Sequence, residues 1–269
     1  MADMALIQVN ISPHVSEQLE ITEIHDAFSG GQKDVFIATR KGQKVAIKIL
    51  RYGLQAREQR EINFYKNNTD LCGIPKIIEI LEVDAQPIII EEYIIGNSLE
   101  KIKESYYGDV AKTSKLIAEL CDIMEPIWDQ MIVHRDLKPD NIIIQPDTSP
   151  VVIDFGIYKN PKITTITETG FQPNTCNFAS PEQLNTNIGT ISYRSDYFSL
   201  GIIAFYLFFQ RLPFGQTRAE IEQCFDSSLN SIWPIENSSS PFNEFFEGIF
   251  HIKPSMRFRN TETLKMRLP

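Results

Sequence analysis

The feature that most constrains this chain is the segment at residues 134–141, which reads HRDLKPDN and is followed, after an apolar run, by DFG at residues 154–156. These segments contribute the carboxylates of Asp136 and Asp154 and the amide of Asn141. A carboxylate can orient an attacking hydroxyl, and an aspartate together with an asparagine can hold Mg²⁺ ions. The spacing therefore predicts a metal-assisted catalytic site whose parts the fold must bring together.

The first third of the chain has the pattern of an antiparallel sheet. Short apolar runs rich in β-branched residues, at residues 35–37, 44–50 and 87–93, alternate with polar turns. One helix is predicted at residues 54–67, where several side chains share one face. Beyond this part the apolar spacing becomes helical, so the pattern indicates an α+β fold with the sheet first.

The second part is predicted to be mainly helical. Apolar residues between Ile117 and Met131 recur at the spacing of a core-facing stripe, although Pro126 is expected to kink that helix or end it early. The longest apolar run, at residues 197–209, is shorter than the roughly 20 residues needed to span a bilayer. We therefore expect a buried helix there and no membrane span.

The amino-acid composition limits the binding partners and the cellular location expected for the chain. The 269 residues include 35 acidic and 26 basic side chains, for a net charge of -9, which argues against nucleic acid as a partner. The start of the chain lacks the basic and then apolar layout of a secretion signal. The four cysteines are scattered and form no C-x-x-C pair, so we expect thiols in a reducing cytoplasm.

Five segments in order resemble motifs of the eukaryotic-like (Hanks-type) Ser/Thr protein kinases, including bacterial members. The HRDLKPDN and DFG segments resemble the catalytic loop and the metal-binding motif. Residues 45–48 (VAIK) resemble the lysine motif of the third strand, residues 174–183 the end of the activation segment, and residues 195–201 the start of the central helix. The resemblance covers nearly the whole chain.

This resemblance implies a bilobal protein kinase-like fold. Residues 1–94 would form an N-lobe with a small antiparallel sheet and one regulatory helix. Residues 95–269 would form a larger, mainly helical C-lobe with the catalytic loop, the activation segment and the substrate-binding surface. The chain would transfer the γ-phosphate of ATP to a protein substrate.

The resemblance also implies roles for individual residues. Asp136 would be the catalytic base, and Lys48 and Lys138 would contact the phosphates. Glu61 would be the ion partner of Lys48, and Thr175 would touch the catalytic Asp136 and Lys138. The implied Mg²⁺ ligands are Asn141 and Asp154.

The implied nucleotide contacts are less regular. Val35 and Ala46 would close over one face of the adenine ring and Ile143 over the other, and Glu92 and Ile94 would lie in the hinge strand that contacts adenine through its backbone. The glycine loop departs from the family, because it keeps only Gly30 of the three glycines, with Gly31 beside it.

Glu91 falls at the position that guards the pocket behind adenine. A buried carboxylate there would need a partner. Further along, Glu182 is expected to form a buried ion pair with Arg257, and Asp196 is expected to tie the central helix to the catalytic loop.

Three functions stay open at this point. The leading one is an active Ser/Thr protein kinase with autophosphorylation in trans, through self-association, at Thr167 or Thr169 of the activation loop. A pseudokinase scaffold is compatible with the altered glycine loop. A kinase-fold phosphotransferase acting on small molecules ranks last, because such enzymes typically carry Gly at the position of Arg135.

Overall fold

The computed structural model describes residues 11–29, 33–51, 71–154, 176–226, 232 and 240–269. These residues divide into two compact units. The sheet unit holds the described residues up to Ile94 except Cys72–Ile74. The helical unit holds Cys72–Ile74 and the described residues from Ile95 onward.

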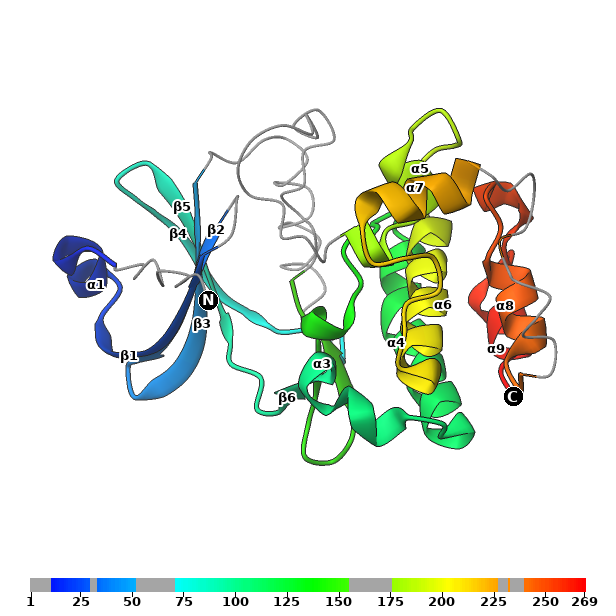
Figure 1. Cartoon of the computed structure of the whole chain (residues 1–269). Helices are drawn as coiled ribbons and strands as arrows, with labels where there is room; N and C mark the ends of the chain where they lie inside the picture. The colour runs from blue at the N-terminus through cyan, green and yellow to red at the C-terminus, as the bar shows by residue number, and fades with distance from the viewer. Residues whose placement is uncertain (1–10, 30–32, 52–70, 155–175, 227–231, 233–239) are drawn as a thin grey trace, which may run out of the picture. The chain divides into compact units, whose positions relative to one another are not determined.

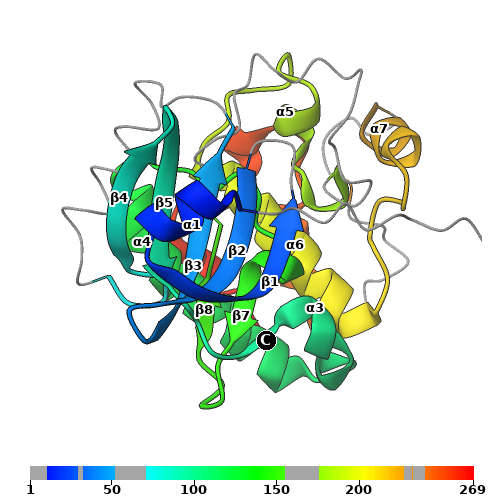
Figure 2. The same cartoon turned by 90° about the vertical axis from the view of Figure 1, so that its left-hand side faces the viewer.

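The sheet unit is built on a five-stranded antiparallel sheet with the strand order β1-β2-β3-β5-β4 (Figures 1 and 2). Its strands are β1 (Ile21–Ser29), β2 (Lys33–Arg40), β3 (Gln43–Leu50), β4 (Ile77–Val83) and β5 (Gln86–Glu92). The strands predicted from the apolar runs are therefore confirmed. The helix predicted at residues 54–67 lies outside the described residues.

A short helix that the sequence pattern did not predict, α1 (Pro13–Gln18), lies across one face of this sheet (Figure 2). Ser12 caps it by accepting a hydrogen bond from Val15 N at 3.2 Å, and a proline occupies the first turn. Val15 and Leu19 pack into the core of that face, and Arg40 Nε donates to Leu19 O at 2.9 Å. The helix is thus part of the core of the sheet unit.

The helical unit is organised around two long helices, α4 (Val110–Trp128) and α6 (Tyr193–Phe209), which pack against each other (Figure 1). Its other helices are α3 (Leu99–Ile102), α5 (Pro181–Leu184), α7 (Arg218–Asp226), α8 (Asn243–Ile249) and α9 (Thr261–Lys265). Its 3-10 turns are η1 (Lys103–Tyr106), η2 (Pro139–Asn141), η3 (Cys176–Phe178) and η5 (Pro254–Met256). Its small antiparallel sheet has the strands β6 (Asn97–Ser98), β7 (Ile142–Ile144) and β8 (Pro150–Val152).

Pro126, which was expected to kink its helix or end it early, lies in the last turn of that helix. The helix α4 continues through Pro126 to Trp128, where the N–H of Asp129 donates to Glu125 O at 2.9 Å. A proline removes one helical hydrogen bond, but Ile127 and Trp128 are both buried in the core. Their packing holds the last turn in place.

The apolar run at residues 197–209 forms most of α6, and the prediction of a buried helix is confirmed because most of its side chains are buried. Such all-round burial is the expected environment of a helix that is apolar on every side. Within the described part of the chain, no helix is long and apolar enough to cross a membrane.

Candidate active site

Val35, Ala46 and Lys48, three of the predicted nucleotide residues, share one face of the sheet. Val35 lies opposite Lys48 across β2 and β3, and Ala46 lies opposite Glu91 across β3 and β5. Directly opposed residues point to the same face, and so do residues two apart on one strand. Val35, Ala46, Lys48 and Glu91 are therefore on the face opposite to the one that α1 covers.

Lys48 forms an ion pair inside this sheet. Its Nζ lies 2.6 Å from Glu91 Oε2, and the two side chains are 9% and 12% exposed. The partner required by a buried Glu91 is therefore Lys48. Glu61, the expected partner of Lys48, lies outside the described residues, as do Gly30 and Gly31, so their roles stay predictions.

Glu92 and Ile94, the predicted hinge residues, lie at the end of the sheet unit. Glu92 is opposite Val45, so its side chain points to the other face of the sheet from Lys48. Its Oε1 accepts a hydrogen bond from Lys76 N at 3.1 Å, and its N–H donates to Lys76 O at 2.9 Å. Ile94 is the last residue of this unit before the helical unit continues.

The catalytic-loop segment of the helical unit is anchored by Asp196 at the start of α6. Its carboxylate accepts hydrogen bonds from His134 N at 2.8 Å, Arg135 N at 2.9 Å and Trp128 Nε1 at 2.8 Å. The sequence predicted this connection. Gln183 adds a contact that was not predicted, since its Nε2 donates to Arg135 O at 2.8 Å.

Burial raises the pKa of Asp196 to about 6, while the hydrogen bonds from Trp128, Arg135 and His134 act in the opposite direction. Desolvation disfavours the ionised carboxylate, whereas donors directed at its oxygens favour it. The three donors thus offset part of the cost of a buried charge and hold the backbone ahead of Asp136.

His134 is buried beneath the loop and holds it from inside. Its Nδ1 accepts from Asp136 N at 3.2 Å, and its Nε2 lies 3.2 Å from Ile153 O. A carbonyl oxygen can only accept, so the tautomer that satisfies both contacts carries its proton on Nε2. The imidazole therefore links the loop to the segment that leads to Asp154.

Asp136, Lys138 and Asn141 meet at the centre of the loop. Asn141 Nδ2 donates to Asp136 O at 2.8 Å and to Asp136 Oδ2 at 3.2 Å. Lys138 Nζ lies 3.5 Å from the same Oδ2, with both side chains below one fifth exposed. The loop thus brings the predicted base, the predicted phosphate ligand and one predicted metal ligand together.

Asp154 and Ile143 are positioned by the small sheet. Ile153 N donates to Asn141 O at 2.8 Å, which connects the end of β8 to the loop. Asp154 follows with a φ of 62°, in the left-handed region that non-glycine residues rarely adopt. Ile143 is half-buried on β7, opposite Ser98 and Val151. Thr175 lies outside the described residues.

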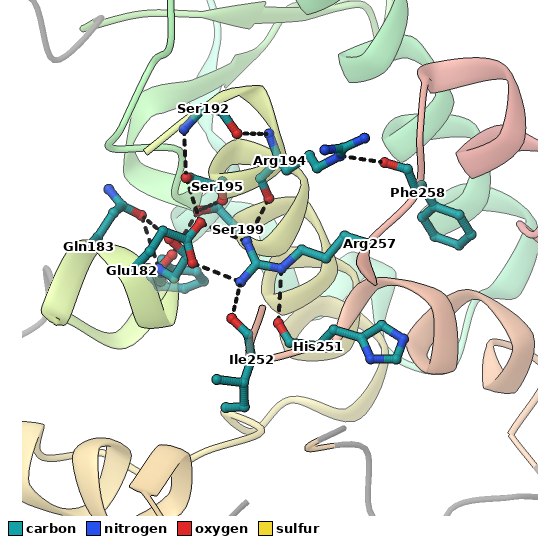
Figure 3. A network of polar contacts seen from close by, with 12 residues as sticks. Glu182, Gln183, Ser192, Arg194, Ser195, Ser199, His251, Ile252, Arg257 and Phe258 are labelled. Atoms are coloured by element: carbon teal, nitrogen blue, oxygen red, sulfur yellow. Dashed lines mark hydrogen bonds and ion pairs between the residues drawn. The ribbon is translucent and has the colours of Figure 1, made fainter. Parts of the chain in front are cut away.

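The predicted pair of Glu182 and Arg257 is present and fully buried (Figure 3). Arg257 Nη1 lies 2.7 Å from Glu182 Oε1, and Nη2 lies 2.8 Å from Oε2. Three backbone carbonyls accept further hydrogen bonds from the guanidinium, those of His251, Arg194 and Ile252. Such a fork-to-fork contact, together with the carbonyls, satisfies the guanidinium donors in a fully buried environment.

The chain matches the family model described as "Protein kinase domain" over residues 29–268. It is 31% identical over 189 residues to the probable serine/threonine-protein kinase PknB of Lactococcus lactis, covering 68% of this chain and 29% of the relative. It is 29% identical over 216 residues to the serine/threonine-protein kinase PknB of Mycolicibacterium smegmatis, covering 75% and 34%. For the serine/threonine-protein kinase PknA of Nostoc sp. the identity is 29% over 165 residues, covering 60% and 29%.

The matched region spans about a third or less of the length of these curated relatives. Within this chain the family model covers nearly everything from the end of β1 onward, including the predicted site residues of each unit. The antiparallel sheet unit and the helical unit with its catalytic loop are the architecture that the motifs predicted. This chain belongs to the protein kinase domain family, and within that family it is similar to the bacterial serine/threonine-protein kinases named above.

Proposed function

We propose that this chain is a serine/threonine protein kinase that transfers the γ-phosphate of ATP to serine or threonine hydroxyls of a protein substrate. The observation that supports this best is the environment of Asp136 Oδ2, which is approached by Lys138 Nζ at 3.5 Å and by Asn141 Nδ2 at 3.2 Å. The relatives named above are serine/threonine kinases, which supports the same class of acceptor.

In this function Asp136 orients the attacking hydroxyl and accepts its proton on a carboxylate oxygen. Lys138 places a positive charge next to that carboxylate, where it would stabilise negative charge on the transferred phosphoryl group. The hydrogen bond from Asn141 Nδ2 to Asp136 Oδ2 holds the Asp136 side chain in position, and Lys48 holds the α- and β-phosphates.

Magnesium fits the residues of this loop. The amide nitrogen of Asn141 donates to Asp136, so the carbonyl oxygen of that side chain is the atom offered to a cation. Asp154 would add a carboxylate, and few protein ligands suffice because Mg²⁺ keeps several waters and takes phosphate oxygens. When bound, the ion would neutralise the phosphate charges.

Thr167 and Thr169 remain the predicted sites of autophosphorylation. One copy of the chain would phosphorylate another, which requires self-association. Both residues lie outside the described residues. A phosphate there adds about 1.5 to 2 negative charges at neutral pH, and the arginine preceding the base, Arg135, would be its partner. Mass spectrometry after incubation with Mg·ATP tests whether these residues are phosphorylated. The predicted cellular location of the chain remains the cytoplasm.

The test of the function is incubation with labelled ATP, Mg²⁺ and a basic protein acceptor. The wild-type chain should label serine and threonine, and Asp136→Asn should lower the rate by about 10²–10³, the effect of losing one transition-state contact. Asp147→Asn is the matched control, because Asp147 is an exposed residue in the turn after β7. Nucleotide binding without any transfer by wild type would instead support the scaffold function.

A second variant separates the base from the metal ligand. Asp154→Asn should weaken binding of ATP in the presence of Mg²⁺, whereas Asp136→Asn should leave that binding nearly intact. Calorimetric titration with and without Mg²⁺ makes the comparison. Equal affinities of Asp154→Asn and wild type for Mg·ATP would contradict the assignment of Asp154.

A further inference from the structure

The ion pair between Lys48 and Glu91 assigns a role to a residue outside the expected catalytic set. We propose that Glu91 is a positioning residue, which holds the Lys48 ammonium in place for the nucleotide phosphates from the neighbouring strand of the same sheet. This inference rests on the proposed function, in which Lys48 contacts the α- and β-phosphates.

The sheet register fixes the geometry of the pair. Lys48 lies opposite Ile89, and Glu91 lies two residues further along β5, opposite Ala46. The two charged side chains are therefore diagonal neighbours on one face, a spacing that long side chains bridge. Because both strands belong to one hydrogen-bonded sheet, the pair needs no other element to bring its partners together.

Because both side chains of the pair are largely buried, each charge depends on the other. The side chains of Lys48 and Glu91 are 9% and 12% exposed. Taking either charge out of water alone is costly, so each side chain depends on the other as its ion partner. The carboxylate of Glu91 thus places a specific constraint on the position of the Lys48 ammonium.

Ordering the Lys48 side chain before the ligand arrives favours the binding of phosphate. A lysine side chain is long and loses considerable rotamer freedom when it is fixed. A partner that already orders it in the free protein reduces the cost of ordering it on ligand binding. An ammonium has three N–H donors, so a bond to Glu91 is compatible with bonds to phosphate oxygens.

The experiment compares Glu91→Gln with Glu79→Gln. Glu79 also forms a 2.6 Å ion pair in this sheet, with Arg40, but it lies opposite Ile90, on the face that α1 covers. The substitutions are chemically identical and remove one carboxylate charge each. Thermal melts of both variants establish that the fold is retained.

Calorimetry with two ligands separates positioning from a general structural effect. Glu91→Gln should weaken ATP binding about tenfold and leave adenosine binding within twofold of wild type, since adenosine has no phosphate for Lys48 to hold. Glu79→Gln should leave both affinities within twofold. In a Lys48→Met background, Glu91→Gln should cause no further loss of ATP affinity.

The outcomes distinguish this inference from the proposed function. ATP affinity that is unchanged or higher in Glu91→Gln would overturn the inference, and a rise would show that Glu91 competes with the phosphates for Lys48. Equal losses for ATP and adenosine would overturn it too, since they indicate a structural effect. Absence of phosphoryl transfer by wild type, with the selective loss of ATP affinity intact, would overturn only the proposed function.

Discussion

In the helical unit, the backbone around Asp136 is held by buried polar side chains such as Asp196 and Asn141, whereas in the sheet unit Lys48 lies on a strand and forms an ion pair with Glu91 of the neighbouring strand. The difference follows from the local structure. A loop has no ladder of backbone hydrogen bonds, so side chains such as Asp196 and Asn141 must satisfy its backbone groups. A strand already satisfies its backbone groups in the ladder and fixes the direction of each side chain.

The stabilising interactions of the two units differ in the same way. The helical unit contains the fully buried ion pair of Glu182 and Arg257 (Figure 3). In the sheet unit, apolar side chains of the α1 segment pack against one face of the sheet. A buried ion pair depends strongly on both partners. An apolar contact loses stability in proportion to the atoms removed.

Arg257→Ala should have the largest effect, because it leaves the Glu182 carboxylate buried without its cation. We expect a loss of about 3–5 kcal/mol in the free energy of unfolding, measured by urea denaturation. Arg267→Ala is the control, since its pair with Glu244 is 55% and 70% exposed and should contribute less than about 1 kcal/mol. Similar losses in the two variants would mean that burial does not set the strength of these pairs.

Leu19→Ala tests the apolar counterpart in the sheet unit. Leu19 is completely buried, so its truncation should cost about 3 kcal/mol in the free energy of unfolding. Ile24→Ala on β1 is the control, because Ile24 is 43% exposed and its truncation should cost less than about 1 kcal/mol. A loss below 1 kcal/mol for Leu19→Ala would show that α1 is not part of the core.

The pH dependence of stability tests the anchor of the catalytic loop. The pKa of Asp196 is raised to about 6 in the folded chain, above its usual value of about 3.9 in an unfolded chain. The folded state therefore binds the proton more tightly, and this contribution to stability is present below about pH 4 and is lost as pH rises through about 6.

The measurable quantity is the difference in unfolding free energy between wild type and Asp196→Asn, whose side chain does not titrate. That difference should shift against wild type by about 2–3 kcal/mol between pH 4 and pH 7. Urea denaturation at several pH values gives the slope. A constant difference across this range would mean that the pKa of Asp196 is not raised.

The smallest expected effect on stability concerns a polar cluster at the ends of β1, β2 and β3. Arg51 Nη2 donates to Ser29 Oγ at 2.5 Å and to Asp34 Oδ1 at 2.7 Å, on the two sides of the predicted glycine loop. Because the cluster is exposed, Arg51→Gln should cost less than about 1 kcal/mol. It should nevertheless raise the Michaelis constant for ATP severalfold, because the substitution removes the hydrogen bonds that connect the residues on the two sides of the predicted glycine loop.

Lys41→Gln is the matched control for Arg51→Gln. Lys41 pairs with Glu20 at 2.7 Å, with side chains 61% and 57% exposed, in the turn between β2 and β3. It should leave the ATP kinetics unchanged. Equal Michaelis constants for ATP in the two variants would show that the cluster does not contribute to nucleotide binding.

Much of the site could be predicted because its motifs are local. The HRDLKPDN segment contains Asp136, Lys138 and Asn141 within six residues, so their proximity follows from one loop. The strands could be predicted from alternation, since a side chain two residues along a strand returns to the same face. The pairing of Glu182 with Arg257, although distant in sequence, followed from the order of the family motifs.

Other features could not be predicted from local pattern. The helix α1 is short, and its signals are the Ser12-Pro13 start and the spacing of Val15 and Leu19, which are weak without the sheet that they cover. The exact end of α4 could not be predicted from Pro126 alone, because the buried side chains of Ile127 and Trp128 also stabilise the last turn.

By itself the sequence determined which residues are candidates for the chemistry, because the motifs are contiguous and strand alternation assigns each side chain to a face. Only the tertiary structure decided which of them meet across strands. In the order β1-β2-β3-β5-β4, the strand next to β3 is β5, although β4 precedes β5 in the chain. That neighbourhood brings Glu91 to Lys48, because the packing and hydrogen bonding of the whole sheet set the strand order, and no segment encodes it alone.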